Sequence, residues 1–165
     1  MSTRPDATLG TLLRHLIEKL DGAVEQSYVR SGLDYRPRYT PIVRALIQSG
    51  PASIRAISRN AGITHSAVSQ TVAQMMERGL VRFDSGGDAR ERIVALTPAA
   101  KAMIPTLQQC WQATNAAADR LDTELSMPLS ELLREAIDAL DSTPFAQRIE
   151  TAAAKQKRSR SRKKR

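Results

Sequence analysis

Residues 53–97 have the types and the spacing that contact with DNA requires. Two short helical patterns are joined by a tight turn at residues 61–63, as in a helix-turn-helix. The second helix of such an element enters the major groove of DNA, where it contacts base edges. A hairpin with a glycine-rich tip follows and carries Asp88, Arg90 and Arg92. Arg90 can enter the minor groove, most readily where A·T-rich sequence narrows it. Asp88 is repelled by phosphate and is better suited to holding the turn.

The first half of the second helical pattern carries small polar side chains that match the hydrogen-bonding groups of bases. An amide such as that of Gln70 can pair with adenine, and hydroxyl groups can donate to or accept from several bases. The candidates for base contacts are Thr64, His65, Ser66, Ser69 and Gln70. Ser66 and Ser69 can also be solvated helix positions, but exposed small polar residues on this helix fit contact with DNA better. For His65 a surface position without a role has equal support.

Arginine side chains near this helix are candidates for contacts with DNA phosphates, which position a protein without reading the sequence. These candidates are Arg55, Arg78, Arg82 and Arg92. An alternative for Arg78 and Arg82 has equal support, because both can pair with a nearby carboxylate, that of Glu77, Asp84 or Glu91.

Local signals set the limits of the elements in this region. Ser53 and Thr64 are expected to be N-caps, and Gly79 is expected to end the second helix in the left-handed conformation. The side chains expected to face inward are Val68, Val72, Met75 and Met76. Short β runs at residues 80–83 and 93–96 flank turn residues 85–88, so that they predict a hairpin.

Helical patterns on both sides must hold this element in place. Residues 8–30 have apolar residues at spacings of three and four, which predicts an amphipathic helix ended by Ser31-Gly32. Thr40-Pro41 predicts the start of another helix, with Thr40 as its N-cap. A long helix is expected to begin at Thr97-Pro98 and to bend at Pro105.

Apolar residues along the long helix form a heptad-like seam over residues 103–121. A last helix is predicted over about residues 127–140. The seam and the apolar stripe of residues 8–30 both call for a helical partner, because they are long for a monomer whose middle is already packed.

The composition excludes several classes of protein. Hydrophobic residues make up 41% of the 165 residues and aromatic residues only 4%, so the core must be aliphatic and the chain mainly helical. The single Cys110 excludes an internal disulfide and a thiolate zinc cage. The sequence contains no catalytic Ser–His–Asp set, no phosphate-binding loop and no metal-ligand spacing. We therefore expect no enzyme and no cofactor.

The sequence has no signal-peptide pattern at its start, and no stretch approaches the roughly 18 apolar residues of a membrane span. A cytoplasmic protein without a membrane partner is the expectation. The charge is uneven, because the last eleven residues hold eight Lys or Arg, which equals the formal net charge of +8. Residues 1–154 are therefore neutral overall, and the DNA hypothesis rests on the local pattern rather than on the pI.

The order of the elements resembles that of the MarR family of winged-helix transcriptional regulators over residues 8–141. The resemblance is carried by AISRNAGITHSAVSQTVAQMMERGLV followed by DARERIVALT. In that family a Gly-Leu-Val-type exit from the recognition helix precedes a wing with Asp-x-Arg, and a Leu-Thr pair starts the next helix. The corresponding residues here are Gly79-Leu80-Val81, Asp88 with Arg90, and Leu96-Thr97.

The resemblance implies a mainly α fold with a small β-wing, in which a winged helix-turn-helix head joins a helical dimerisation region. We expect residues 1–38 to form an N-terminal dimerisation helix and loop, and residues 39–97 to form the DNA-binding domain. Residues 98–150 would be the C-terminal dimerisation helices and residues 151–165 a disordered basic tail. The implied partners are double-stranded DNA and a second copy of the chain.

Many members of the family bind a small, often aromatic, molecule between the dimer helices and the head. The candidates for such a site here are Tyr28, Tyr35, Arg38, Tyr39 and Trp111. Taken singly, each is better explained as an ordinary packing or interface residue. Some members sense oxidants through a cysteine, but Cys110 lies on the inward seam, where burial makes a thiol unreactive.

Several hypotheses of function are therefore compared. The first is a dimeric, sequence-specific repressor on a palindromic operator, relieved by a small aromatic or phenolic ligand. The second is a non-specific, architectural DNA-binding protein whose affinity comes from the basic tail. A winged-helix module for protein contacts is disfavoured, because the outward face of residues 64–78 is polar and small.

Overall fold

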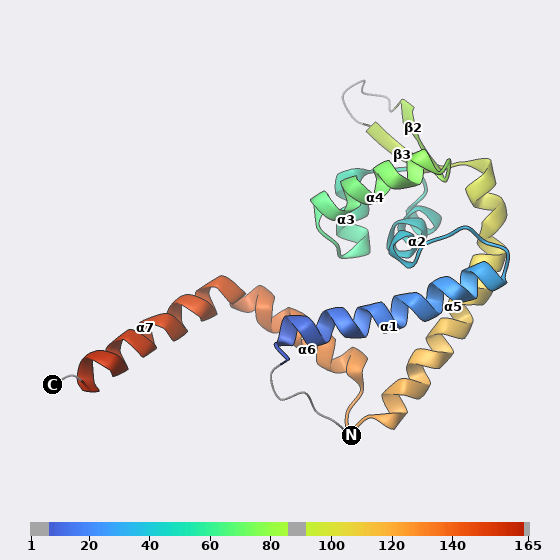
Figure 1. Cartoon of the computed structure of the whole chain (residues 1–165). Coiled ribbons are helices and arrows are strands. Elements are labelled where there is room, and N and C mark those ends of the chain that lie inside the picture. Colours follow the sequence, from blue (N-terminus) through green and yellow to red (C-terminus); the bar gives the residue numbers. More distant parts are fainter. Residues whose placement is uncertain (1–6, 86–91, 164–165) are drawn as a thin grey trace. The chain divides into compact units, whose positions relative to one another are not determined.

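The structure, a computed structural model, describes residues 7–85 and 92–163 (Figure 1). The chain divides into two units, residues 1–114 and residues 115–165, and each is described by itself. The first unit contains the three-stranded sheet and the helix-turn-helix, and the second contains the C-terminal helices. The fold is mainly α with a small antiparallel sheet, as the sequence predicted.

The first helix, α1, covers Leu9–Arg30 and has the predicted limits. The hydroxyl of Thr8 accepts a hydrogen bond from the Thr11 amide at 3.3 Å, which caps the N-terminus. Ser31 is the C-cap, and Gly32 follows with a φ of 75°, a left-handed conformation that glycine adopts without steric cost. The C-terminal end is thus set by the predicted residues Ser31 and Gly32, whereas the Thr8 cap was not predicted.

The start of the next helix differs from the prediction. A 3-10 helix, η1, covers Pro37–Tyr39 and continues directly into α2, which covers Thr40–Ser49. Thr40 is therefore already helical, with φ −54° and ψ −47°, and the N-cap position falls on Tyr39 without a side-chain cap. The Thr40 hydroxyl instead lies 3.3 Å from the hydroxyl of Tyr28.

The helix-turn-helix consists of α3 (Ile54–Ala61) and α4 (His65–Glu77). Ser53 and Thr64 are its N-caps, as predicted, and the Thr64 hydroxyl accepts from the Ala67 amide at 3.2 Å. Gly62 makes the turn with a φ of 66°, in the left-handed region where a side chain is strained. The hydroxyl of Ser58 donates to the Ile63 carbonyl at 2.6 Å and closes the turn.

The sheet has the strand order β1-β3-β2, with both pairs antiparallel. Strand β2 (Val81–Ser85) and strand β3 (Arg92–Leu96) form the predicted hairpin, and Val81 faces Leu96 in the register. Strand β1 (Ala52–Ser53) was not predicted. The wing tip, with Asp88 and Arg90, lies outside the described residues.

The core of the first unit joins α2, α3 and α4 to the sheet and to one end of α1. Its fully buried side chains include Tyr28, Tyr39, Ile42, Ile57, Val68, Val72, Met75, Val94 and Leu107. The prediction that Met76 faces inward was wrong, because 39% of this residue is exposed. Successive helical residues are rotated by about 100°, so burial of Met75 turns its neighbour toward solvent.

The long helix α5 covers Pro98–Glu124 and runs through Pro105 without a break. Its cap is Thr97, whose hydroxyl accepts from the Ala100 amide at 3.2 Å and donates to the Gly79 carbonyl at 2.7 Å. The same residue therefore starts α5 and fixes the chain where it leaves α4.

In the second unit, α5 is followed by α6 (Leu129–Ser142) and α7 (Phe145–Lys163). The carboxylate of Asp122 accepts from the Leu129 amide at 2.8 Å and from the Ser130 hydroxyl at 2.7 Å. The expectation of disorder from residue 151 was wrong for residues 151–163, which are helical. Alanine, lysine, arginine and glutamine favour helix, and residues 145–163 contain neither glycine nor proline.

Several large apolar side chains are exposed on the helices outside the head. Those of α1 are Leu9, Leu12, Leu13, Ile17, Leu20 and Val29, and those of α6 are Leu132, Leu133, Ile137 and Leu140. Even so, no helix within the described ranges combines the length and the hydropathy needed to span a membrane.

Candidate nucleic-acid interface

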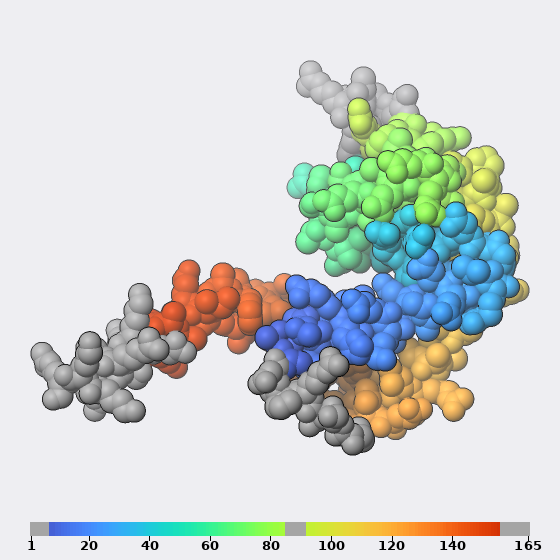
Figure 2. Space-filling view, in the orientation of Figure 1, coloured from blue at the N-terminus to red at the C-terminus, as the bar shows by residue number. Residues whose placement is uncertain are grey.

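Helix α4 has one apolar face that holds it in the head and one polar face that is open to solvent. Val68, Val72 and Met75 are at most 1% exposed and fix the inner face. The residues predicted to contact bases are all exposed on the helix or at its N-cap: Thr64, His65, Ser66, Ser69 and Gln70. Figure 2 shows the surface of α4, in green, uncovered on one side of the head. The structure thus brings these five side chains to one accessible surface.

The N-terminus of α4 suits an anionic partner. Free amide groups and the aligned peptide dipoles give a helix N-terminus a partial positive charge. Thr64 uses its hydroxyl for one of these amides, and the first turn of α4 contains no acidic side chain. Strand β2 contacts α4, and Figure 1 shows the described strands of the hairpin beside that helix.

The predicted phosphate contacts fall into two groups. Arg55 on α3 and Arg92 on β3 are exposed, and the Arg92 guanidinium lies 5.3 Å from the centroid of the Phe83 ring. Arg82 instead donates to both carboxylate oxygens of Asp84, at 2.7 and 3.2 Å. Arg90, the predicted minor-groove residue, lies outside the described residues.

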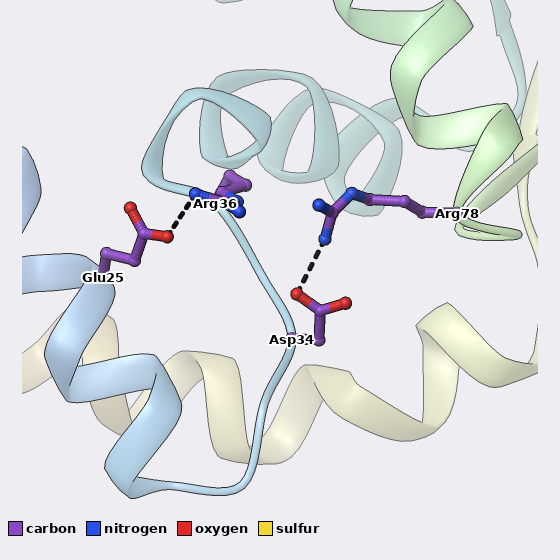
Figure 3. A network of polar contacts seen from close by, with 4 residues as sticks. All are labelled: Glu25, Asp34, Arg36 and Arg78. Atoms are coloured by element: carbon purple, nitrogen blue, oxygen red, sulfur yellow. Dashed lines mark hydrogen bonds and ion pairs between the residues drawn. The ribbon is translucent and has the colours of Figure 1, made fainter.

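Arg78 forms an ion pair that the sequence analysis did not anticipate. Its guanidinium donates to the carboxylate of Asp34 at 2.7 Å, across 44 residues of sequence. This hydrogen bond is the largest cause that raises the pKa of Arg78 above its ordinary value. Arg36, two residues after Asp34, pairs with Glu25 of α1 (Figure 3). The contact of Arg78 with a carboxylate was foreseen, but its partner was not among the three neighbours considered.

Comparison with known proteins agrees with this architecture. Residues 31–91 match the sequence model of the MarR family. Residues 31–91 of this chain are thus similar in sequence to the MarR family. None of the curated protein sequences matches it significantly.

Solved structures of transcriptional regulators share the fold. A probable regulator from Pseudomonas aeruginosa aligns with a TM-score of 0.58 at 23% identity, over 83% of this chain and 99% of that one. M. tuberculosis MOSR, solved in complex with DNA, aligns with a TM-score of 0.64 at 16% identity, over 85% and 98% of the two chains. Bordetella bronchiseptica BpsR, whose DNA binding is regulated by 6-hydroxynicotinic acid, gives 0.57 at 22% identity, over 84% and 99%.

Four of the five candidate ligand residues form one buried aromatic cluster. Tyr35 makes edge-to-face contacts with Tyr28 and Tyr39, at centroid distances of 5.0 and 5.6 Å. The indole N–H of Trp111 donates to the Tyr28 hydroxyl at 3.1 Å. These contacts make the four aromatic residues part of the core, whereas Arg38 is exposed.

The Tyr35 hydroxyl differs from its neighbours because it is buried without a hydrogen-bond partner in the described part of the chain. Burial is the largest cause that raises the pKa of this phenol, and the nearby Thr40 hydroxyl opposes it. A separate pocket of about 440 Å³ adjoins the wing strands, and its lining includes Leu46, Arg82 and Ile104. None of the five candidate ligand residues lines that pocket.

The thiol of Cys110 is buried in the core of the first unit. It donates to the hydroxyl of Ser31 at 3.3 Å, across the contact between α5 and the end of α1. This environment agrees with the packing role that the sequence analysis favoured for the cysteine.

Proposed function

We propose that two copies of this chain bind a near-palindromic DNA operator and repress transcription, without enzymatic activity. The observation that carries the proposal is the two-faced α4, whose inner face is fully buried while Ser66, Ser69 and Gln70 are exposed. Burial of the inner face holds the helix in a fixed orientation, which direct contacts with base edges require. A polar surface of small residues also fits the major groove better than a protein partner.

A homodimer is supported by the exposed apolar side chains of the helices outside the head. Six such side chains lie on α1 and four on α6, in addition to Phe145 and Ile149 on α7. Several large apolar side chains exposed along one helix favour an interaction site. Two-fold symmetry would pair the same surface of both copies and place two α4 helices on one face of DNA.

In the proposed complex the two α4 helices enter successive major grooves, about 34 Å apart. Gln70 would pair with adenine through its amide, while the hydroxyls of Thr64, Ser66 and Ser69 and the ring of His65 face other base edges. Arg90 would enter the adjacent minor groove. Arg55 and Arg92, which are exposed, are the better placed candidates for phosphate contacts.

We further propose that a small aromatic or phenolic molecule relieves repression. Support comes from a protein of the same fold, BpsR, whose DNA binding responds to 6-hydroxynicotinic acid. A ligand of that class would change operator affinity by binding one arrangement of the dimer better than another. The buried cluster of Tyr28, Tyr35, Tyr39 and Trp111 would have to open for such a ligand to reach it.

The test is selection of bound duplexes from a random DNA pool, with the full chain and with residues 1–154, at two salt concentrations. Enrichment of one inverted repeat by both chains supports the proposed function. Absence of enrichment, together with loss of binding on truncation, would instead support an architectural protein that binds DNA through its basic end.

A matched pair of variants then locates the contact. Gln70→Ala should weaken binding to the enriched duplex by roughly 5- to 100-fold, because a good bidentate base contact provides about 1–3 kcal/mol of discrimination. Gln48→Ala, the same change at an exposed position of α2, should leave the affinity unchanged. Equal effects of the two substitutions would place the interface elsewhere.

A further inference from the structure

We infer that Asp34 is a positioning residue for recognition helix α4, because its ion pair with Arg78 ties the C-terminal end of α4 to the loop that follows α1. The inference rests on the proposed function, since it concerns the accuracy with which α4 meets DNA. Figure 3 shows the four side chains of the network, which come from α1, the loop and the end of α4.

The loop is a firm anchor because it is fixed on both sides of Asp34. On one side, the Leu33 amide donates to the Tyr28 carbonyl at 2.9 Å. On the other side, the Tyr35 ring is 2% exposed between two aromatic rings, and Arg36 pairs with Glu25 of α1. The backbone of Asp34 is therefore held to α1, although its carboxylate is largely exposed.

The other partner of the ion pair, Arg78, lies at the last turn of α4. Arg78 is the C-cap residue, and its amide donates to the Gln74 carbonyl at 3.2 Å. Its guanidinium points toward the Asp34 carboxylate, to which it donates a hydrogen bond, rather than toward the N-terminal half of the helix (Figure 3). Among the ion pairs within the described residues, this one alone joins α4 to the α1–α2 connection.

The distance between the Asp34–Arg78 ion pair and the proposed base contacts explains how a weak ion pair can affect DNA recognition. At 1.5 Å per residue, Arg78 lies about 20 Å along the axis from Thr64. Buried residues in the middle of α4 act as a pivot, so that a small tilt at the C-terminal end moves the N-terminal half in the opposite direction. Hydrogen bonds to base edges tolerate displacements of only a few tenths of an ångström, whereas contacts with phosphates made by long side chains tolerate more.

The pair should therefore affect specific binding without a matching effect on stability. Exposed ion pairs contribute little to folding, and both Asp34 and Arg78 keep part of their side chains in solvent, 85% and 34% respectively. Removal of either group leaves the core and the Thr97–Gly79 hydrogen bond intact, but the end of α4 loses its link to the loop after α1. The role differs from a phosphate contact, which would change the salt dependence of binding by about one counterion.

The experiment uses the full chain and two probes, the duplex that wild-type protein enriches from a random pool and a scrambled duplex of equal length. Asp34→Asn and Arg78→Gln should each weaken binding to the enriched duplex by about 3- to 10-fold, with the same dependence on salt as wild type. Affinity for the scrambled duplex and the thermal midpoint should stay unchanged. Asp119→Asn, which removes an exposed carboxylate from α5, is the matched control and should bind as wild type does.

Charge exchange provides the decisive variant. The double substitution Asp34→Arg with Arg78→Asp reverses the pair and should recover most of the lost affinity, which a general structural lesion would not. Tighter binding and a steeper salt dependence for Asp34→Asn would overturn the inference, because Arg78 would then be a phosphate contact held back by Asp34. Unchanged affinity in both single variants would overturn it as well. Failure of wild-type protein to distinguish the two duplexes would refute the proposed function itself.

Discussion

The hydroxyl groups of two adjacent tyrosines are expected to have opposite effects on stability. The Tyr28 hydroxyl accepts from the buried indole N–H of Trp111 at 3.1 Å and lies 3.3 Å from the Thr40 hydroxyl. The Tyr35 hydroxyl, in the adjoining ring, is buried without a partner in the described part of the chain. The substitution of phenylalanine removes one oxygen atom from each ring and keeps the edge-to-face packing.

The expected magnitudes follow from this difference in hydrogen bonding. Tyr28→Phe leaves the Trp111 N–H buried and unpaired, which should lower the free energy of unfolding by about 1–3 kcal/mol. Tyr35→Phe removes a hydroxyl that loses its hydration on folding and gains only the nearby Thr40 hydroxyl, with which it forms no hydrogen bond of normal geometry, so it should be neutral or should stabilise by up to about 1–2 kcal/mol. For a chain of this size, 1 kcal/mol corresponds to roughly 2–4 °C in the thermal midpoint.

Thermal and urea unfolding followed by circular dichroism at a fixed protomer concentration measure both effects, since a dimer's midpoint depends on concentration. Trp111 is the single tryptophan of the chain, so its fluorescence should change in folded Tyr28→Phe and stay close to wild type in Tyr35→Phe. If Tyr35→Phe destabilised the protein as much as Tyr28→Phe, the assignment of an unpaired hydroxyl to Tyr35 would be refuted.

Three further outcomes can be measured with the same equipment. Gly22→Ala, inside α1 with open space at its Cβ, should stabilise by about 0.5–1 kcal/mol, whereas Gly79→Ala, at a φ of 65°, should destabilise by about 1 kcal/mol. Burial raises the pKa of Tyr35 above the value of about 10 of an unfolded tyrosine. The neutral Tyr35 phenol therefore contributes its full stability below pH 10, and this contribution is lost as the pH rises above 10. Between pH 9 and pH 11 the urea midpoint should fall more for wild type than for Tyr35→Phe. Met75→Ala, which empties a buried position, should cost about 2–5 kcal/mol in urea titrations, and a loss below 1 kcal/mol would contradict the packing of α4.

Features that depend on a few consecutive residues could be predicted from the sequence. Ser53 and Thr64 cap their helices, as expected, because an N-cap requires only a short polar side chain and the amides of the next turn. Likewise, a glycine with positive φ follows α1 and α4. Thr40 has the same local signal, but the preceding 3-10 turn places it inside the helix and its hydroxyl bonds to α1.

Features that depend on tertiary contacts could not be predicted. Strand β1 is two residues long, and its extended conformation comes from pairing with Val94 and Ile93 of β3 rather than from its own sequence. The partner of Arg78 was missed for the same reason, because Asp34 comes near α4 only when the loop after α1 has folded against it. No pattern of spacing within α4 contains that information.

The candidate site also contains features that follow from local sequence and features that depend on tertiary contacts. Exposure of the five candidate base-contact residues follows from helical periodicity once Val68 and Val72 are assigned to the core, and the structure confirms it. Whether these side chains contact bases stays a prediction, as does the role of Arg90. The proposed ligand residues are the opposite case, since the aromatic residues pack together through contacts between α1, η1 and α5 that the sequence does not encode locally.

The two faces of α4 allow loss of folding to be separated from loss of recognition. A substitution on the inner face, such as Met75→Ala, lowers DNA binding by lowering the folded fraction, so binding should recover under conditions that stabilise the fold, such as added osmolyte. A substitution on the outer face, such as Gln70→Ala, leaves the folded fraction unchanged, so osmolyte should restore nothing. Arg78 belongs to neither face, because its side chain is exposed and yet paired with Asp34 of the loop that follows α1. Its variants should behave as the outer face does with osmolyte, because the fold is intact, although the side chain does not lie among the residues proposed to contact bases.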